Sequence, residues 1–561
     1  MKTTSKCMLS LGMLAPLASC GDRSEPARPN IIFFLVDDYG WSDSANDYGD
    51  KPYPKPIEIH TPNMERLARA GVVLTSAYAC PVSSPTRTSL MTGMHAAHEH
   101  ITNYLAPKQD MPTDCMAGHL DYSASLSGVQ PSGLERGEWN WNGICPEGQG
   151  PDTLAHVQRA TMLPQILQDA GYFTIHVGKA HFAPYGTPAA SPCNMGFVVN
   201  VAGNCVGLPG SYLSEDHYGN TPEKWSYEAV QDMTQYYETG MHLTEALTRE
   251  ALRTMDYPVS KGQPFFLYMS HFAVHTPIQA DMRYYQKYRD AGYDEGQSRY
   301  ASMVEGVDTS LGEILDYVER KGIADNTVII FYSDNGGHSI DNRKGGVVHT
   351  QNAPLREGKG SCYEGGVRVP MMFRWKGHSA EGVRINTPVN AEDLFPTILD
   401  FAGAAGAQTV QPLDGESLVG LFVDGSQYVA AQGCFGTVAE ANRFVVPQSV
   451  SGVDPERPII SHYPHQWRRV IYDDIDYLSS IRKGDWKLIY RMKTGALELY
   501  DLAEDIAERH DLAAENPQIV ERMARELSDR LRAWDATMPR YAADGRTVPM
   551  PDEVIVRKDR P

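Results

Sequence analysis

The stretch NIIFFLV, residues 30–36, is followed directly by Asp37 and Asp38. A continuous apolar run of this length is typical of a strand that is covered on both faces, as in a parallel sheet between two layers of helices. Ligands of open α/β sheets bind at the carboxyl ends of the strands. The segment therefore predicts an α/β fold with a functional site that includes these two carboxylates.

The rest of the first 425 residues repeats this design. Apolar runs that end in turn residues alternate with helical patterns, and Pro or Thr precedes several of the helices. Helices are expected at 61–67, 161–170 and 300–321, and further strands at 172–177, 264–270 and 327–333. This alternation favours a mostly parallel sheet with helices on both faces.

The pattern weakens after about residue 425. Residues 427–458 are expected to connect two parts of the chain, whereas 479–490 and 497–501 are typical of antiparallel strands. A closing helix is indicated by Met523, Leu527, Leu531 and Trp534, which recur at helical spacing. We therefore predict a catalytic domain at 29–425, a smaller C-terminal α/β subdomain with an antiparallel sheet at 426–545, and a tail at 546–561.

The first residues have the pattern of a targeting segment. Basic residues precede a short apolar run, 8–17, which ends near Leu-Ala-Ser-Cys20 and resembles a bacterial lipobox. We expect a lipoprotein signal peptide at 1–20, a lipidated Cys20 and a tether at 21–28. The expected product is an exported lipoprotein, periplasmic or at the surface of a Gram-negative bacterium, which contacts the membrane only through its lipid anchor. The alternative is a cytosolic protein with a chance cysteine.

Charge and cysteine content exclude several classes of protein. The chain has 50 basic and 70 acidic residues, a formal net charge of −20, which argues against nucleic acid as a partner. The nine cysteines show neither zinc-site spacing nor a dense disulfide framework. A bridge between Cys193 and Cys205 stays open at this point.

A second segment carries most of the functional information. The residues SSPTR, 83–87, precede Thr92 and Gly93. Pro85 suits the first turn of a helix because its missing N–H is not needed there. Free N–H groups at a helix start favour an anion, and Arg87 adds a planar fork of donors for oxyanions. The alternative is an ordinary Ser/Pro helix start.

This segment resembles the signature of the type I, formylglycine-dependent sulfatases: Cys or Ser, any residue, Pro, any residue and Arg, with Thr-Gly a few positions on. In that family the first residue becomes formylglycine, which here would be Ser83. A serine at this position implies conversion by an anaerobic sulfatase-maturating enzyme, and hence an anaerobic host. The resemblance is to a Ser-type bacterial carbohydrate sulfatase. It covers roughly residues 29–405 and implies an alkaline-phosphatase-like fold.

Two pairs of oxygen donors follow two of the predicted strands. Asp37 and Asp38 follow the first, and Asp334 and Asn335 follow the strand at 327–333. Hard oxygen donors suit Ca²⁺ or Mg²⁺ better than zinc, although each pair alone could simply cap a loop. The resemblance assigns all four, together with Ser83, as ligands of a divalent cation, with Ca²⁺ preferred over Mg²⁺.

Three further elements match the family in the correct order. Lys179 and His181 lie in a Gly-Lys-x-His element, in which Ala180 replaces the common Trp. His275 lies in a His-x-Pro element and Lys359 in a Gly-Lys-Gly element. The resemblance implies that Lys179 binds sulfate and the nucleophile, and that His181 takes a proton from the remaining hydroxyl so that sulfate leaves. It also implies that His275 and Lys359 face the bridging oxygen, where one of them protonates the leaving alcohol. Arg87, Lys179, Lys359 and the cation are expected to stabilise charge on the transferring group.

The sequence says less about the substrate. His98 and His100 follow the signature helix, and His462 and His465 lie in the C-terminal subdomain. We take these four as substrate-binding candidates; solvent exposure or loop packing is the alternative. The expected reaction is exo-hydrolysis of a sulfate ester on a glycan, with galactose or N-acetylgalactosamine as examples. The alternative interpretations are a phosphodiesterase or phosphonate monoester hydrolase of the same superfamily, or an inactive glycan-binding relative with unmodified Ser83.

Overall fold

The computed structural model describes residues 28–46, 55, 57–110, 134–135, 140–221, 228–338, 352–433, 444–465, 475–541 and 544–558. The expected signal peptide, Cys20 and nearly all of the tether lie outside these residues. Within the described ranges, no helix combines the length and apolarity that a membrane crossing requires.

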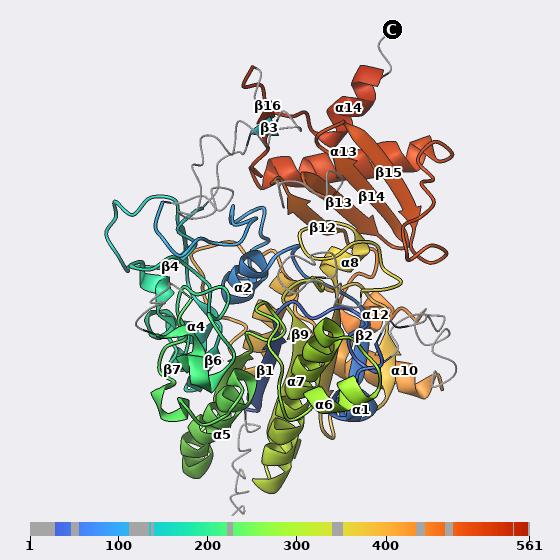
Figure 1. The fold of residues 1–561 in the computed structure, drawn as a ribbon. Helices are drawn as coiled ribbons and strands as arrows, with labels where there is room; N and C mark the ends of the chain where they lie inside the picture. Colours follow the sequence, from blue (N-terminus) through green and yellow to red (C-terminus); the bar gives the residue numbers. More distant parts are fainter. Residues whose placement is uncertain are drawn as a thin grey trace, which may run out of the picture.

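The core of the molecule is an eight-stranded sheet with the order β11-β2-β10-β9-β1-β8-β6-β7 (Figure 1). The predicted first strand, β1, lies near its middle and runs parallel to both β8 and β9. β10 is antiparallel to its two neighbours, and the other pairings are parallel. This confirms the mostly parallel α/β sheet. Its strands are β1 (Asn30–Val36), β2 (Val72–Tyr78), β6 (Phe173–Gly178), β7 (Val199–Val201), β8 (Phe265–Ser270), β9 (Thr327–Ser333), β10 (Arg368–Trp375) and β11 (Val383–Ile385).

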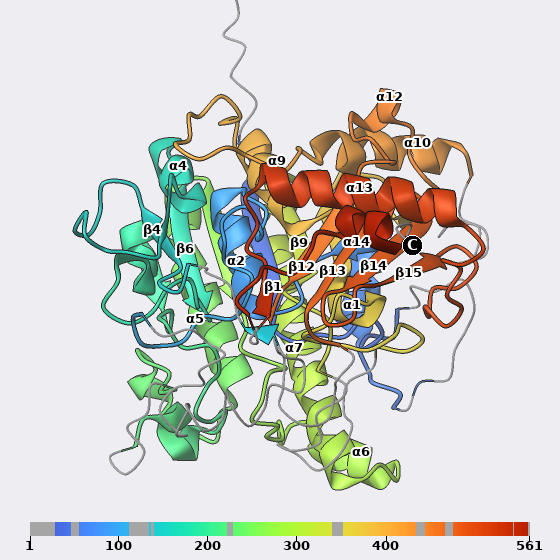
Figure 2. The same cartoon turned by 90° about the horizontal axis from the view of Figure 1, so that it is seen from above.

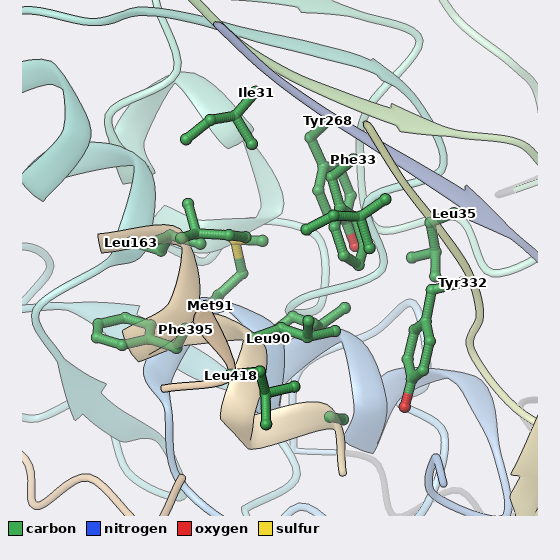
Figure 3. Close-up of a cluster of buried hydrophobic side chains, with 14 of the residues drawn as sticks. Ile31, Phe33, Leu35, Leu90, Met91, Leu163, Tyr268, Tyr332, Phe395 and Leu418 are labelled. Carbon is green, nitrogen blue, oxygen red and sulfur yellow. The ribbon is translucent and has the colours of Figure 1, made fainter. Parts of the chain in front are cut away.

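Helices cover both faces of this sheet because side chains alternate along each strand. Ile31, Phe33 and Leu35 of β1 belong to one buried cluster, which also contains Leu90 and Met91 (Figure 3). The intervening side chains of β1 belong to a second buried cluster on the opposite face. The first cluster includes α2 (Ser83–Thr92), α4 (Leu163–Asp169) and α9 (Leu394–Phe401), and the second includes α1 (Pro62–Arg69), α5 (Leu243–Lys261) and α7 (Glu295–Arg320).

The C-terminal subdomain is built on a four-stranded antiparallel sheet, as the sequence predicted. Met523, Leu527 and Leu531 of the closing helix pack against Ile481 and Leu488 of this sheet. Figures 1 and 2 show the subdomain on one edge of the main sheet. Its elements are β12 (Ile459–Tyr463), β13 (Leu478–Lys483), β14 (Trp486–Arg491), β15 (Ala496–Asp501), α13 (Pro517–Ala533) and α14 (Pro551–Lys558).

Two parts of the sequence-based division need correction. A π-helical turn, Leu421–Gly425, runs directly into α10 (Ser426–Ala431), so a boundary at 425 falls inside a helical segment. Val429 of α10 is buried in the catalytic core, which explains why this segment stays with that domain. The expected tail contains α14, held to α13 by an Arg532–Asp552 ion pair of 2.8 Å.

Several short elements complete the fold. They are α6 (Tyr285–Asp290), α8 (Glu364–Val367), α12 (Gln448–Ser451), and the strand pairs β3 (Leu134–Glu135) with β16 (Arg540–Tyr541) and β4 (Ile144–Pro146) with β5 (Gln158–Ala160). Cys193 and Cys205 are both free thiols, so the bridge that the sequence left open is not formed.

Candidate active site

The carboxyl ends of β1, β6, β8 and β9 meet at one edge of the main sheet, because these strands are parallel neighbours. Three predicted ligands, Asp37, Asp38 and Asp334, stand directly after β1 and β9. Each offers a carboxylate oxygen, and these oxygens all lie within 4.8 Å of one another. Their side chains are buried, at 0–1% exposure. The structure thus brings the two predicted acidic pairs together.

Ser83 and Asn335 complete this cluster. Ser83 is the first residue of α2, and its Oγ lies 3.1 Å from both Asp37 Oδ1 and Asn335 Oδ1. The side-chain amide of Asn335 donates to Asp38 Oδ1 at 2.8 Å. Asp38 itself has φ 58°, a left-handed conformation that Asp tolerates better than most residues. All five predicted metal ligands therefore share one buried site.

Each carboxylate of the cluster pairs with a buried, positively charged side chain. Lys179 Nζ lies 2.7 Å from Asp37 Oδ2, and Lys359 Nζ lies 2.5 Å from Asp38 Oδ1.

Arg87 pairs with Asp334 Oδ2, at 2.9 Å from Nε and 2.7 Å from Nη2. The Arg87 side chain is fully buried, and its Nη1 also donates to Ser270 Oγ at 2.6 Å. A planar guanidinium can make these contacts at once, which a lysine cannot.

The electrostatics of the cluster fit a divalent cation. Burial and the nearby Asp334 raise the pKa of Asp37 to about 7, against the pull of Lys179 and Lys359. Burial pushes the pKa of Asp38 upward as well, but Lys359 and His275 hold it well below its ordinary value. A divalent cation among these oxygens would favour the ionised carboxylates. Carboxylate, amide and Ser83 oxygens are the hard donors that Ca²⁺ and Mg²⁺ take.

His181 contacts Ser84, the residue that follows Ser83, and its ring is neutral. Its Nε2 is 2.8 Å from the carbonyl oxygen of Leu105, and its Nδ1 is 3.2 Å from Ser84 Oγ. A carbonyl only accepts, so Nε2 carries the proton and Nδ1 is the basic nitrogen. Burial, followed by the charge of Lys179, holds the pKa of His181 well below its ordinary value. The ring is therefore neutral at neutral pH, with Nδ1 as its unprotonated nitrogen.

His275 lies beside Asp38. Its Nε2 is 3.7 Å from Asp38 Oδ2, and its side chain is 14% exposed. Burial holds its pKa well below the ordinary value, although Asp38 opposes this shift. The hydroxyl of Tyr212 donates to the carbonyl oxygens of Phe272 at 2.7 Å and His275 at 2.9 Å, which fixes the loop.

Four supporting residues escaped the sequence analysis. Ser84 lies inside the signature, and Ser270 ends a predicted strand, so both had a signal. His338 follows Asn335 by three positions and is buried, and its charge is among the causes that lower the pKa of Asp38. Tyr212 had no signal, because it acts only on backbone oxygens.

The four histidines expected to touch substrate lie where the loop after α2 meets the C-terminal subdomain. His98 Nδ1 lies 2.9 Å from Asp414, and His100 Nδ1 lies 3.4 Å from Thr537 Oγ1. His462 and His465 are buried; they contact Ser479 Oγ at 2.7 Å and Thr102 Oγ1 at 2.7 Å, respectively. These contacts connect separate segments of the protein to one another. The binding of substrate by the four histidines stays a prediction.

Comparison with known proteins adds an independent line of evidence. The profile of the Sulfatase family matches residues 29–121 and 151–404. A sulfatase from Formosa agariphila is 28% identical over 616 residues, which covers 100% of this chain and 99% of the relative. N-acetylgalactosamine-6-sulfatase from Rattus norvegicus is 29% identical and covers 70% of this chain and 64% of its own. The crystal structure of Ps i-CgsB in complex with k-i-k-neocarrahexaose is 25% identical, with a TM-score of 0.63 over 95% of this chain and 97% of that one.

Replacing Arg87 by lysine keeps the positive charge but removes the planar set of guanidinium N–H donors. A lysine offers one nitrogen in place of the three through which Arg87 contacts Asp334 and Ser270, so we expect R87K to lower kcat/KM by about 10²–10³-fold. Steady-state kinetics measure the effect. R374K is the matched control, because Arg374, on β10, is also buried and pairs with Glu319 at 2.8 Å. Equal activity losses in the two variants would contradict the role of Arg87.

Removal of divalent cations should weaken both activity and stability. Without a cation, the buried carboxylates repel one another, so a chelator should lower the melting temperature and an added divalent cation should restore it. Asp37→Asn should abolish this response, whereas Asp393→Asn, a buried carboxylate that pairs with Arg457 at 2.9 Å, should keep it. If the chelator leaves the melting temperature of the wild-type protein unchanged, the cation site is refuted.

Proposed function

This chain belongs to the sulfatase family, and from that premise we propose that it hydrolyses sulfate esters of a glycan through a formylglycine residue made from Ser83. The observation that carries the proposal is the position of Ser83. Its side chain stands at the start of α2 between Asp37 and Asn335, within one buried cluster with Lys179, Arg87 and their carboxylate partners. As a sulfatase, the protein is a sulfuric ester hydrolase.

The chemistry requires more than a serine hydroxyl, which is a weak nucleophile. The hydrate of formylglycine supplies one hydroxyl that attacks sulfur as the sulfur–sugar oxygen bond breaks, and a second whose deprotonation releases sulfate and restores the aldehyde. Arg87, Lys179 and the first N–H groups of α2 lie near Ser83 and would stabilise the negative charge on the sulfuryl oxygens. These groups also overcome locally the net charge of −20.

Two histidines and a lysine divide the proton transfers. His181, neutral and adjacent to the signature, would take the proton of the second hydroxyl. His275 and Lys359 both lie beside Asp38, at 3.7 Å and 2.5 Å. One of them would give a proton to the departing sugar oxygen, as general acid catalysis requires.

The proposed cation is Ca²⁺, held by Asp37, Asp38, Ser83, Asp334 and Asn335. When bound, it would hold a sulfate oxygen and polarise the attacking hydroxyl. Calcium accepts several carboxylates in an irregular shell, whereas Mg²⁺ demands near-octahedral geometry and keeps several waters. Three crowded carboxylates therefore favour Ca²⁺ over Mg²⁺.

Sulfated carbohydrate is the substrate class that the comparisons support. One relative is named for N-acetylgalactosamine 6-sulfate, and one similar structure contains a neocarrahexaose. We propose exo-action on a sulfated sugar, with galactose and N-acetylgalactosamine as the first to test. Conversion of Ser83 by an anaerobic maturating enzyme and export as a lipoprotein through Cys20 are parts of the same proposal.

The decisive experiment uses protein co-expressed with an anaerobic sulfatase-maturating enzyme. Mass spectrometry should find formylglycine at position 83, and a panel of defined sulfated galactose and N-acetylgalactosamine saccharides should yield free sulfate. Ser83→Ala should be inactive. Hydrolysis of an aryl phosphate faster than its matched aryl sulfate would favour the phosphodiesterase or phosphonate monoester hydrolase reading. Full sulfatase activity with an intact Ser83 would refute the formylglycine mechanism.

Loss of the proposed base should block turnover without unfolding the protein. We expect His181→Ala to lower kcat by about 10²–10⁴-fold, the usual contribution of a positioned base, while formylglycine still forms. Kinetics combined with mass spectrometry of residue 83 separate catalysis from maturation. His217→Ala is the control, because that ring pairs with Glu238 at 2.8 Å on a loop after β7. A kcat of H181A equal to that of the control would remove His181 from the mechanism.

A further inference from the structure

A buried ion cluster links the C-terminal sheet to the loop that carries Lys359. Lys487 of β14 is 1% exposed, and its Nζ lies 2.8 Å from Glu364 Oε1 and 3.0 Å from Glu508 Oε1. Both glutamates are fully buried. Glu364 begins α8, and its backbone N–H donates to Glu508 Oε2 at 2.7 Å (Figure 1). One lysine of the subdomain thus pairs with two buried carboxylates, one of which directly follows the loop that carries Lys359.

The same glutamate is tied to the main sheet. Glu364 Oε2 accepts hydrogen bonds from the Tyr78 hydroxyl at 2.8 Å and from Arg368 at 3.1 Å. Arg482 of β13 donates to that Tyr78 hydroxyl at 2.6 Å. Since Tyr78 ends β2, the cluster joins α8 to both sheets at the edge where the active site lies.

A tightly packed backbone connects Glu364 to the active site. The N–H of Lys359 donates to the Gly337 carbonyl at 3.1 Å, and that of Gly360 donates to the Pro81 carbonyl at 2.7 Å. A Cβ on Gly336 would lie 1.9 Å from the carbonyl oxygen of Gly365, so the two loops are in direct backbone contact. A shift of α8 must therefore move Lys359, and with it the turn that follows Asp334 and Asn335.

Further contacts clamp the same loop from the subdomain. Arg356 donates to the Tyr500 hydroxyl and to the Glu508 carbonyl, both at 3.1 Å, and its guanidinium lies 3.9 Å from the centre of the Tyr363 ring. The Tyr363 hydroxyl donates to Glu498 at 2.6 Å. The loop is therefore gripped on both sides of Lys359.

From this geometry we propose that Lys487 is a positioning residue of the C-terminal subdomain, which holds Lys359 against Asp38 through Glu364 and α8. The kinetic consequence rests on the proposed function, whereas the structural consequence does not. Without the ammonium of Lys487, Glu364 and Glu508 become adjacent buried carboxylates that repel each other. The loop then loses its fixed place, and a displacement of about 1 Å at a catalytic group is sufficient to slow turnover about 10²-fold.

The test compares Lys487→Met with Lys483→Met in the full, matured protein. Lys483 lies on the neighbouring strand, but its Nζ pairs with Glu526 of α13 at 2.9 Å and not with the loop. Hydrogen exchange of peptides from 352–367 should accelerate in K487M while β13 and α13 stay protected, and should match wild type in K483M. With a sulfated sugar that the wild type hydrolyses, kcat should fall about 10²-fold in K487M, with KM changed far less.

Unchanged exchange in 352–367 in folded K487M would overturn the proposal, and so would equal losses of kcat in the two variants. If K487M does not fold, Glu364→Gln replaces it, because it keeps the shape of the cluster and removes the charge through which Lys487 holds α8. The same loop-specific acceleration is then expected, and its absence is fatal to the proposal. A wild type that releases no sulfate would refute the proposed function, and the exchange measurement would still decide the role of Lys487.

Discussion

Three buried carboxylates at one edge of a parallel sheet are the constraint that organises this structure. Oxygens of Asp37, Asp38 and Asp334 lie within 4.8 Å of one another. Like charges this close in a protein interior repel strongly, and their removal from water adds a further cost. The chain compensates by pairing each carboxylate with a buried Lys or Arg. Because these positive and negative side chains balance each other, the site can also accommodate the charge of a cation and that of an anionic substrate.

The fold places these polar groups beyond the ends of the strands, so the strands themselves are not strained. β1 and β9 are buried on both faces, so polar residues can follow only where the strands end. The parallel pairing of these strands brings those ends together, and α2 adds its N-terminus at the same edge. The positive groups are local to this edge, whereas the molecule as a whole is strongly acidic. Recognition of a sulfate ester must therefore come from short-range contacts with these groups and not from long-range attraction.

The sequence was most informative where structure follows from local patterns. The strand predicted at 327–333 has these same bounds in the structure, because its apolar run and the Asp that follows it are both local signals. The helix predicted from 300 begins at Glu295, since Asp294 and Gln297 form a capping box before the apolar stripe starts. The final helix α14 was missed because its place is fixed by α13, which is distant in sequence.

A similar division applies to the site. Motifs identified Ser83, Lys179 and Lys359, because these side chains belong to recognisable elements of the family. The groups that orient the site residues could not be predicted from the sequence, because several of them are backbone atoms. The Leu105 carbonyl fixes the tautomer of His181, and the Gly337 carbonyl accepts a hydrogen bond from the backbone of Lys359. Such acceptors exist in every residue and leave no trace in the sequence.

The loop after α2 shows that the C-terminal subdomain also contacts the site from a second direction. His95 Nε2 lies 2.9 Å from the Ile460 carbonyl, and Thr102 contacts His465 at 2.7 Å. Three residues beyond Thr102, Leu105 holds His181 through its carbonyl and Ser84 through its N–H. The small sheet therefore touches both the segment that orients the proposed base and the loop that carries Lys359. Because it contacts both segments, this sheet can fix the distance between His181 and Lys359 more firmly than either loop alone.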